Sequence, residues 1–145
     1  MRTKVHLVGQ FSDTHVSRYT LPFYAEPVRA GFPSPAEDFI DGNLDLNDYL
    51  VQHPAATFFV RVSGNAMHRA GIVSGDILIV DRSLEPSDGK IIIAALDGEL
   101  LVRRYKQVQN QVWLLADPRH EDAIVVTGDM HCEIWGVVTS VIHKT

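Results

Sequence analysis

The 145-residue sequence contains one cysteine, Cys132, so no disulfide can form within the chain. A lone thiol is typical of a reducing compartment, and a cytoplasmic location is expected. No apolar run approaches the roughly 20 residues of a membrane-spanning helix. Residues 1–10 also lack the apolar segment of a secretory signal. The seven histidines show no metal-ligand spacing with Cys132, so neither a metal nor a cofactor is expected.

Basic residues are scarce after the first 30 positions. Residues 1–30 carry a net charge of +2, from four basic and two acidic side chains, whereas residues 31–145 carry −7, from nine basic and 16 acidic side chains. Phosphate contacts require clustered Lys and Arg, and no helix-turn-helix fits into so short a basic segment. Direct sequence-specific DNA binding is therefore not expected.

Short apolar runs separated by turn residues dominate the sequence after residue 56. Hydrophobic residues make up 46% of the chain, which is enough for the core of one domain. Asp97-Gly98 separates two of these runs and is a strong two-residue hairpin signal. The pattern predicts a mostly β fold: a compact body of short, largely antiparallel strands with an N-terminal extended arm and one or two short helices. The expected strands are 57–62, 76–81, 90–96, 99–105, 111–115, 123–126 and 132–142.

The residues before this region are interpreted differently. Residues 1–29 show no sustained periodicity and are expected to form the extended arm. The two prolines of Ala30-Gly-Phe-Pro-Ser-Pro35 exclude a helix and favour extended backbone. An ordinary linker has this composition, but extended backbone is also what a protease groove binds.

A short helix is predicted over residues 45–51, where Asp45 can cap the first turn. Leu46, Tyr49 and Leu50 then share one face of the helix. That apolar face is expected to pack on the body.

The strand over 57–62 ends in Ser63-Gly64-Asn65-Ala66-Met67, which predicts a sharp corner. Glycine and asparagine tolerate backbone angles that other residues avoid. A corner at a strand end can display a nucleophile. The displayed position in this chain is Ala66, which has none.

Four ordered motifs resemble the self-cleaving LexA/UmuD family, which is of the peptidase S24 type, and they are most similar to those of UmuD-like mutagenesis proteins. Together with a fifth segment near the end, they cover residues 30 to about 140. The segments are Ala30–Pro35, Phe58–Met67, Gly75–Asp81, Asp97–Tyr105 and Glu133–Val138.

The resemblance implies a serine–lysine autopeptidase that cuts its own chain, here between Ala30 and Gly31. The nucleophile position maps to Ala66 and the general-base position to Arg103. Serine needs a base to become a nucleophile, and lysine serves as that base only when burial lowers its pKa. Alanine has no oxygen and arginine stays protonated. Both halves of the dyad are absent, so this chain is predicted to be inactive as a hydrolase.

Several alternatives remain open at this point. Ser63 and Lys106 could act as a substitute pair, although Lys106 would lie on the opposite face of its strand from Arg103. His68 is close to Ala66 but would be a base without a nucleophile. The sequence is equally compatible with engineered and with naturally diverged residues at positions 66 and 103.

The resemblance also implies a function: an accessory subunit of an error-prone translesion DNA polymerase in the SOS response to DNA damage. The implied partners are a second copy in a homodimer, a Y-family polymerase catalytic subunit and the RecA–single-stranded DNA filament. Cleavage would separate an arm, 1–30, from a peptidase-like body, 31–145. One alternative is a non-catalytic binding module or antagonist that pairs with an active homologue; in a variant of it, the homologue supplies the dyad in trans. Another is a LexA-related regulator of a mobile element.

Overall fold

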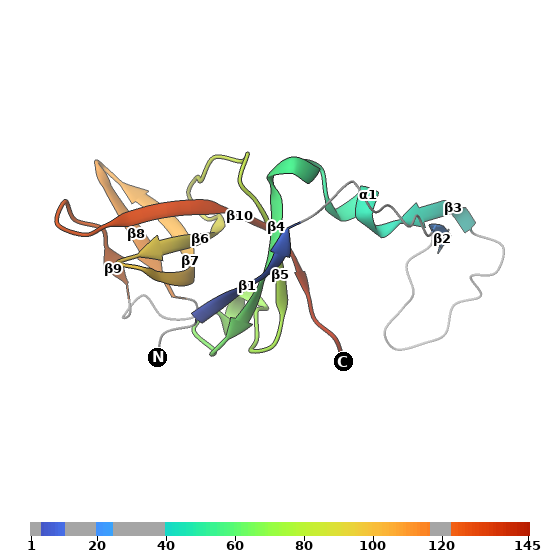
Figure 1. Cartoon of the computed structure of the whole chain (residues 1–145), viewed down its shortest axis with the longest axis horizontal. Coiled ribbons are helices and arrows are strands. Elements are labelled where there is room, and N and C mark those ends of the chain that lie inside the picture. Colours follow the sequence, from blue (N-terminus) through green and yellow to red (C-terminus); the bar gives the residue numbers. More distant parts are fainter. Residues whose placement is uncertain (1–3, 11–19, 25–39, 117–122) are drawn as a thin grey trace.

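The computed structural model of the chain describes residues 4–10, 20–24, 40–116 and 123–145. Strands dominate these residues, with one α-helix and two 3₁₀ turns (Figure 1). The strands are β1 (Lys4–Gln10), β2 (Thr20–Tyr24), β3 (Ile40–Asp45), β4 (Thr57–Ser63), β5 (Ile77–Asp81), β6 (Ile91–Leu96), β7 (Glu99–Val108), β8 (Gln111–Leu115), β9 (Ile124–Val125) and β10 (Cys132–Ile142). The helix is α1 (Leu46–Leu50), and the 3₁₀ turns are Pro54–Ala56 and His68–Ala70.

The main sheet closes on itself. Its eight strands follow the order β1-β4-β5-β10-β6-β7-β8-β9, and β1 also pairs with β7. β1, β4, β5, β10, β6 and β7 therefore form a closed barrel, from which β8 and β9 continue beyond β7. The pairings between the described strands are all antiparallel, for example β4 with β5 and β6 with β7. The mostly β, antiparallel body expected from the sequence is confirmed.

Alternation along the strands supplies the core, because successive side chains point to opposite faces. Along β4, Phe58, Val60 and Val62 are buried and belong to one apolar cluster. β6 contributes to two clusters. Ile93 joins the first, whereas Ile92 belongs to a second cluster formed with residues of β7, β8 and β10. β6 is thus covered on both faces, which explains why its sequence is almost continuously apolar.

Turn chemistry fixes the pairing of β6 with β7. Asp97 and Gly98 have φ angles of +50° and +84°, and Leu96 lies directly opposite Glu99. Positive φ at both central residues is what a tight two-residue hairpin requires. The hairpin predicted at Asp97-Gly98 is confirmed.

The strand bounds expected after residue 56 are close to those of the structure, and 111–115 and 132–142 agree at both ends. β7 is longer than expected because it continues to Val108. Residues 1–29, which show no sustained periodicity in the sequence, contain two strands that were not predicted. β1 and β2 both lie there, β1 in the main sheet and β2 paired with β3.

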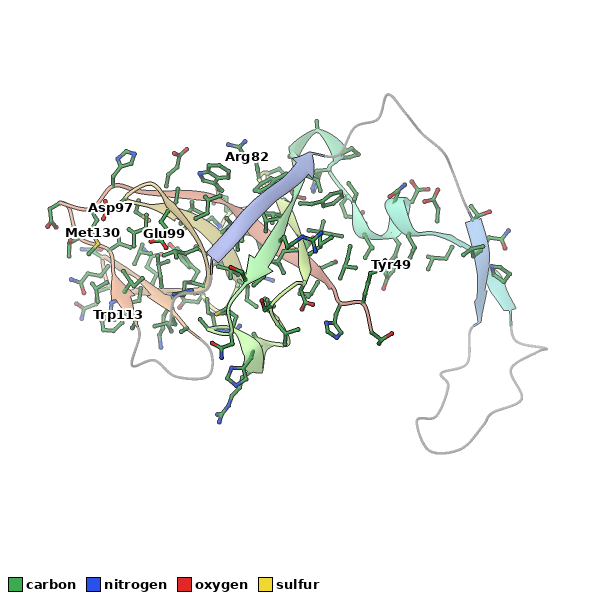
Figure 2. The ribbon with its side chains drawn as sticks, turned by 60° about the horizontal axis from the view of Figure 1, so that its bottom comes forward. Tyr49, Arg82, Asp97, Glu99, Trp113 and Met130 are labelled. Carbon is green, nitrogen blue, oxygen red and sulfur yellow. The ribbon has the colours of Figure 1, made fainter. Side chains whose placement is uncertain are left out.

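α1 begins where the sequence predicts. Asp45 is the N-cap, and its carboxylate accepts the backbone N–H of Asn47 at 2.9 Å. The expected packing of its apolar face on the body is wrong: no helix residue is buried, and Leu46 and Tyr49 are 57% and 65% exposed. The helix and the β2–β3 ribbon lie to one side of the barrel (Figure 1). Tyr49 is on this side, and Trp113 and Met130 lie at the opposite end of the barrel (Figure 2).

Within the described residues, no helix has the length and apolar character needed to cross a membrane.

Candidate functional site

The corner after β4 is a closed loop that runs from Ser63 to Asp76. Gly64 has a φ of +100°, so the glycine of the predicted turn is used as expected. Two backbone hydrogen bonds join the ends of the loop: Gly75 N–H donates to Val62 O at 2.7 Å, and Val62 N–H donates to Asp76 O at 2.9 Å. Val62, near the end of β4, therefore fixes the far end of the loop next to its beginning.

Ala66 lies inside this loop and is only 8% exposed. The next residue, Met67, is fully buried in the first apolar cluster. The Met67 carbonyl accepts N–H groups from Ala70 and Ile72, at 3.0 and 3.3 Å, which fixes the backbone around position 66. A side chain at this position is thus rigidly placed, but in this chain it is a methyl group without a reactive atom.

A buried carboxylate supports the far side of the loop. Asp76 is 3% exposed, and its Oδ2 accepts the Val73 N–H at 2.9 Å. Its Oδ1 lies 2.7 Å from Nδ1 of His143, beyond the end of β10. The two residues are 67 positions apart in the sequence, so no local pattern connects them and the pair was not predicted.

Arg103, the predicted base position, lies on β7 and is 1% exposed. Its Nη1 donates to the carbonyl of Val102 at 2.7 Å. Both faces of β7 are covered at this point. Val102 belongs to the first apolar cluster, and Tyr105, two residues after Arg103, belongs to the second. The guanidinium stem is therefore enclosed within the body rather than spread over its surface.

Backbone pairing brings the two predicted positions into one region through β1. Lys4 is the Cα partner of Ser63 on β4 and of Leu101 on β7. Strands are spaced by about 4.8 Å, so Ser63 and Leu101 lie roughly 10 Å apart with β1 between them. Ala66 follows Ser63 by three positions and Arg103 follows Leu101 by two. The corner and the β7 position thus flank the start of the same strand.

The alternative pair is not brought together in this way. Lys106 is exposed and lies five positions beyond Leu101, about 16 Å along an extended strand. Ser63 stays at the end of β4. His68 is also exposed, and its Nδ1 lies 2.9 Å from the Asn65 carbonyl within the same turn. Its geometry is that of a local turn contact. Ala30 and Gly31 lie outside the described residues.

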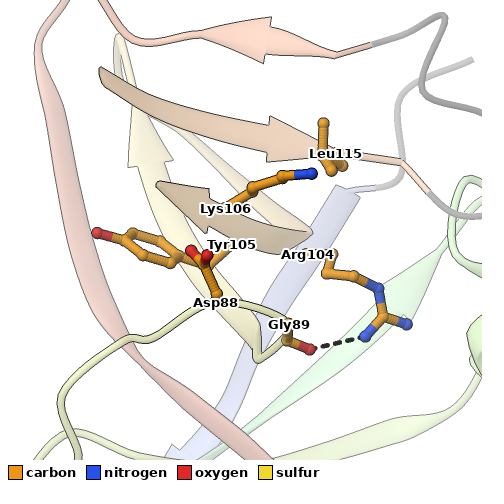
Figure 3. A pocket seen from close by; sticks show the side chains of 6 residues that line it. All are labelled: Asp88, Gly89, Arg104, Tyr105, Lys106 and Leu115. Carbon is orange, nitrogen blue, oxygen red and sulfur yellow. Dashed lines mark hydrogen bonds between the residues drawn. The ribbon is translucent and has the colours of Figure 1, made fainter. Parts of the chain in front are cut away.

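A surface pocket of about 360 Å³ lies beside β7. Arg104 donates to the Gly89 carbonyl at 2.7 Å along its wall (Figure 3). Neither Ala66 nor Arg103 is among its lining residues, which are Asp88, Gly89, Arg104, Tyr105, Lys106 and Leu115. The pocket is therefore separate from the predicted site.

A second histidine–carboxylate pair was also not foreseen. His53 Nδ1 lies 2.6 Å from Oδ2 of Asp81, which is buried at the end of β5. Burial acts to raise the pKa of Asp81, but hydrogen bonds from Ser83 and His53 outweigh it and hold the pKa below its ordinary value. Among the described residues, no group of three His, Cys, Asp or Glu side chains is arranged to hold a metal ion.

A closed antiparallel barrel with a rigid corner at the end of β4, and a buried basic residue on β7 across the intervening β1, is compatible with a peptidase-like β body. The sequence comparison agrees with this class. Residues 22–139 match the family model described as Peptidase S24-like, and the chain belongs to that family. The LexA/UmuD resemblance is thereby confirmed.

Curated relatives cover nearly the whole chain. Protein ImpA of Salmonella typhimurium is 44% identical over 136 residues, which are 88% of this chain and 86% of ImpA. Protein MucA of Escherichia coli is 38% identical over 133 residues, 91% of each chain. The LexA repressor of Aeromonas salmonicida is 35% identical over 120 residues, which are 81% of this chain but 56% of the repressor.

Proposed function

We propose that the chain is a UmuD-like accessory protein of mutagenic DNA synthesis after DNA damage, and that it does not cut itself. One observation carries the proposal. The chain has a Peptidase S24-like body with a closed corner after β4, and the motif resemblance assigns the nucleophile position to Ala66 and the base position to Arg103.

The chemistry of the two residues supports this reading. The Ala66 methyl group cannot attack a carbonyl, however well the loop holds it. Arg103 retains its proton in proteins, and its guanidinium already donates to a backbone carbonyl. No proton acceptor is therefore supplied from that position. Each substitution alone is enough to stop a serine–lysine mechanism.

The proposed partners are a second copy of the chain, the catalytic subunit of a Y-family polymerase and the RecA–single-stranded DNA filament. In this proposal the arm, residues 1–30, is removed from the body, residues 31–145, only when the Ala30–Gly31 bond is cut. The family membership and the relatives' coverage of the chain support the assignment.

The test is intact mass spectrometry of four proteins: the chain itself, Ala66→Ser, Arg103→Lys and the double variant. Each is incubated at mildly alkaline pH with and without the activating filament. We expect a fragment beginning at Gly31 from the double variant alone. The double variant with Ser63→Ala added is the matched control, and it should still cleave. Cleavage of the unchanged chain would refute the proposed inactivity.

A second candidate is a non-catalytic antagonist that pairs with an active homologue or occupies its polymerase. Ala66 and Arg103 favour it, because a chain without the dyad would keep residues 1–30 after the homologue has cut off its own arm. Mixing this chain with an active homologue separates the possibilities. Loss of residues 1–30 from this chain would indicate cleavage in trans and an accessory role. An arm that is retained in a stable mixed complex would favour the antagonist.

A further inference from the structure

β1 occupies a position that a separate peptide could occupy. It lies between β4 and β7, and it is the strand that closes the barrel. The next described residues along the chain begin at Thr20, in the β2–β3 ribbon outside the barrel. β1 is therefore an extended segment inserted between two strands that come from much later in the sequence.

Two kinds of contact hold β1 in place. The first is the antiparallel ladder with β4, which runs from Lys4 opposite Ser63 to Gln10 opposite Phe58. The second is Val5, which is 5% exposed and belongs to the same apolar cluster as Val60 and Val62. A backbone ladder gives affinity to any extended chain, and a side-chain slot at an alternate position gives specificity.

Over its described length, which begins at Lys4, β1 is held mainly by β4. Within these residues its pairing with β7 is at Lys4 opposite Leu101. Its register with β4 shifts between Leu7 and Gly9, which interrupts the ladder. β5 covers the opposite edge of β4, from Thr57 to Arg61. Departure of β1 would therefore expose a long edge of β4 and an apolar slot beside Val60 and Val62, while the rest of β4 stays paired.

We infer that the slot filled by β1 is a docking site for an extended peptide of another protein, and that β1 is its built-in competitor. The occupant is defined by the strand that fills the site now. It is an extended segment with a β-branched apolar residue in the place of Val5, and it binds by antiparallel strand addition to β4. The event that would open the slot in the cell rests on the proposed function: a cut at Ala30–Gly31 would place β1 on the released fragment. The slot itself does not depend on that cut.

The experiment uses the full chain with His6→Cys and Arg61→Cys, in a Cys132→Ser background. Positions 6 and 61 are Cα partners, so a disulfide there can lock β1 onto β4 reversibly. The probe is a fluorescein-labelled peptide of residues 3–11, and binding is followed by fluorescence anisotropy. The same peptide carrying Val5→Asp is the matched control.

We expect the reduced protein to bind the peptide about tenfold more tightly than the oxidised protein, because only an open slot is competent to bind. A full chain carrying Val5→Asp should bind more tightly still, and Val5→Ala serves the same purpose if the first variant does not fold. The control peptide should not bind. Equal binding to the locked and reduced proteins, or no binding to a folded Val5 variant, would overturn the inference. Neither result depends on the cleavage assay, so the two proposals can fail separately.

Discussion

His143 and Asp76 join the end of the chain to the loop that shapes the corner. His143 Nδ1 lies 2.7 Å from Asp76 Oδ1, and the other oxygen of Asp76 accepts the Val73 N–H. One buried carboxylate therefore connects two parts of the molecule that the sequence separates widely. Removing the Asp76 carboxylate should therefore cost more stability than removing the His143 imidazole, because His143 is more than half exposed.

Asp76→Ala is expected to lower the free energy of unfolding by about 1–3 kcal/mol, because it leaves a loop N–H without its acceptor. His143→Ala should cost only about 0–1 kcal/mol, because water competes for an exposed partner. Urea denaturation of both variants measures the difference, with Asp76→Asn as a control of similar volume. An equal cost for the two alanine variants would show that the chain end, rather than the loop, is stabilised by the pair.

Asp81 predicts a loss of stability in acid. Its pKa is lowered in the folded protein despite burial, because Ser83 and His53 hydrogen-bond its carboxylate. The unfolded chain therefore binds a proton more readily, so the stabilisation is complete above about pH 4 and is lost as the pH falls through the folded pKa. Urea midpoints between pH 6 and pH 3 should fall more steeply for the unchanged chain than for Asp81→Asn. Parallel curves would contradict this assignment.

Gly136 on β10 has no room for a larger side chain. A Cβ added there would lie 2.8 Å from the Asp81 carbonyl oxygen and 2.8 Å from Val80 Cγ1. Gly136→Ala is therefore expected to destabilise the fold by about 1–3 kcal/mol through overpacking. Gly128→Ala is the matched control, because no atom lies within 4 Å of its added Cβ. Thermal unfolding of the pair tests the prediction, which fails if the two midpoints shift equally.

Cys132 is expected to react slowly with alkylating agents at neutral pH. Burial raises the pKa of its thiol, and the negative charge of Asp97 raises it further. Because the thiolate is the reactive form, iodoacetamide should modify the folded protein more slowly than the urea-unfolded protein. Asp97→Asn should increase the alkylation rate of the folded protein, because it removes this negative charge. The turn should be preserved, because asparagine tolerates the positive φ at this position. An unchanged rate would assign the slow reaction to burial alone.

Much of the barrel could be predicted because its turns carry strong signals. Asp97-Gly98 predicted one hairpin, and the apolar run that ends at the Ser63-Gly64 turn predicted β4. β1 was missed because a single short strand in a polar N-terminal segment gives a weak pattern, although Lys4, Val5 and His6 do alternate. The face of α1 was misjudged because an apolar stripe does not reveal whether a partner surface lies opposite. In this fold Leu46 and Tyr49 remain exposed.

The sequence predicted the elements that carry Ala66 and Arg103 but not the surroundings of these residues. Motif order placed Ala66 at a corner and Arg103 on a strand, and the structure has both there. The burial of Arg103 was not predictable from alternation, because β7 is covered on both faces, with Val102 and Tyr105 in different clusters. The histidine–carboxylate pairs were invisible because their members come from distant segments.

The closure of the barrel by β1 also constrains the order in which the protein can assemble. β1 is synthesised well before its partners Ser63 and Leu101. At bacterial-type elongation rates of about 5–20 residues per second, the strand waits on the order of ten seconds for its second neighbour. Such distant pairing is slow to form, so we expect ring closure to follow the β4–β5 and β6–β7 hairpins. During that interval the nascent chain presents an open sheet, and its N-terminal strand competes with any other extended segment nearby.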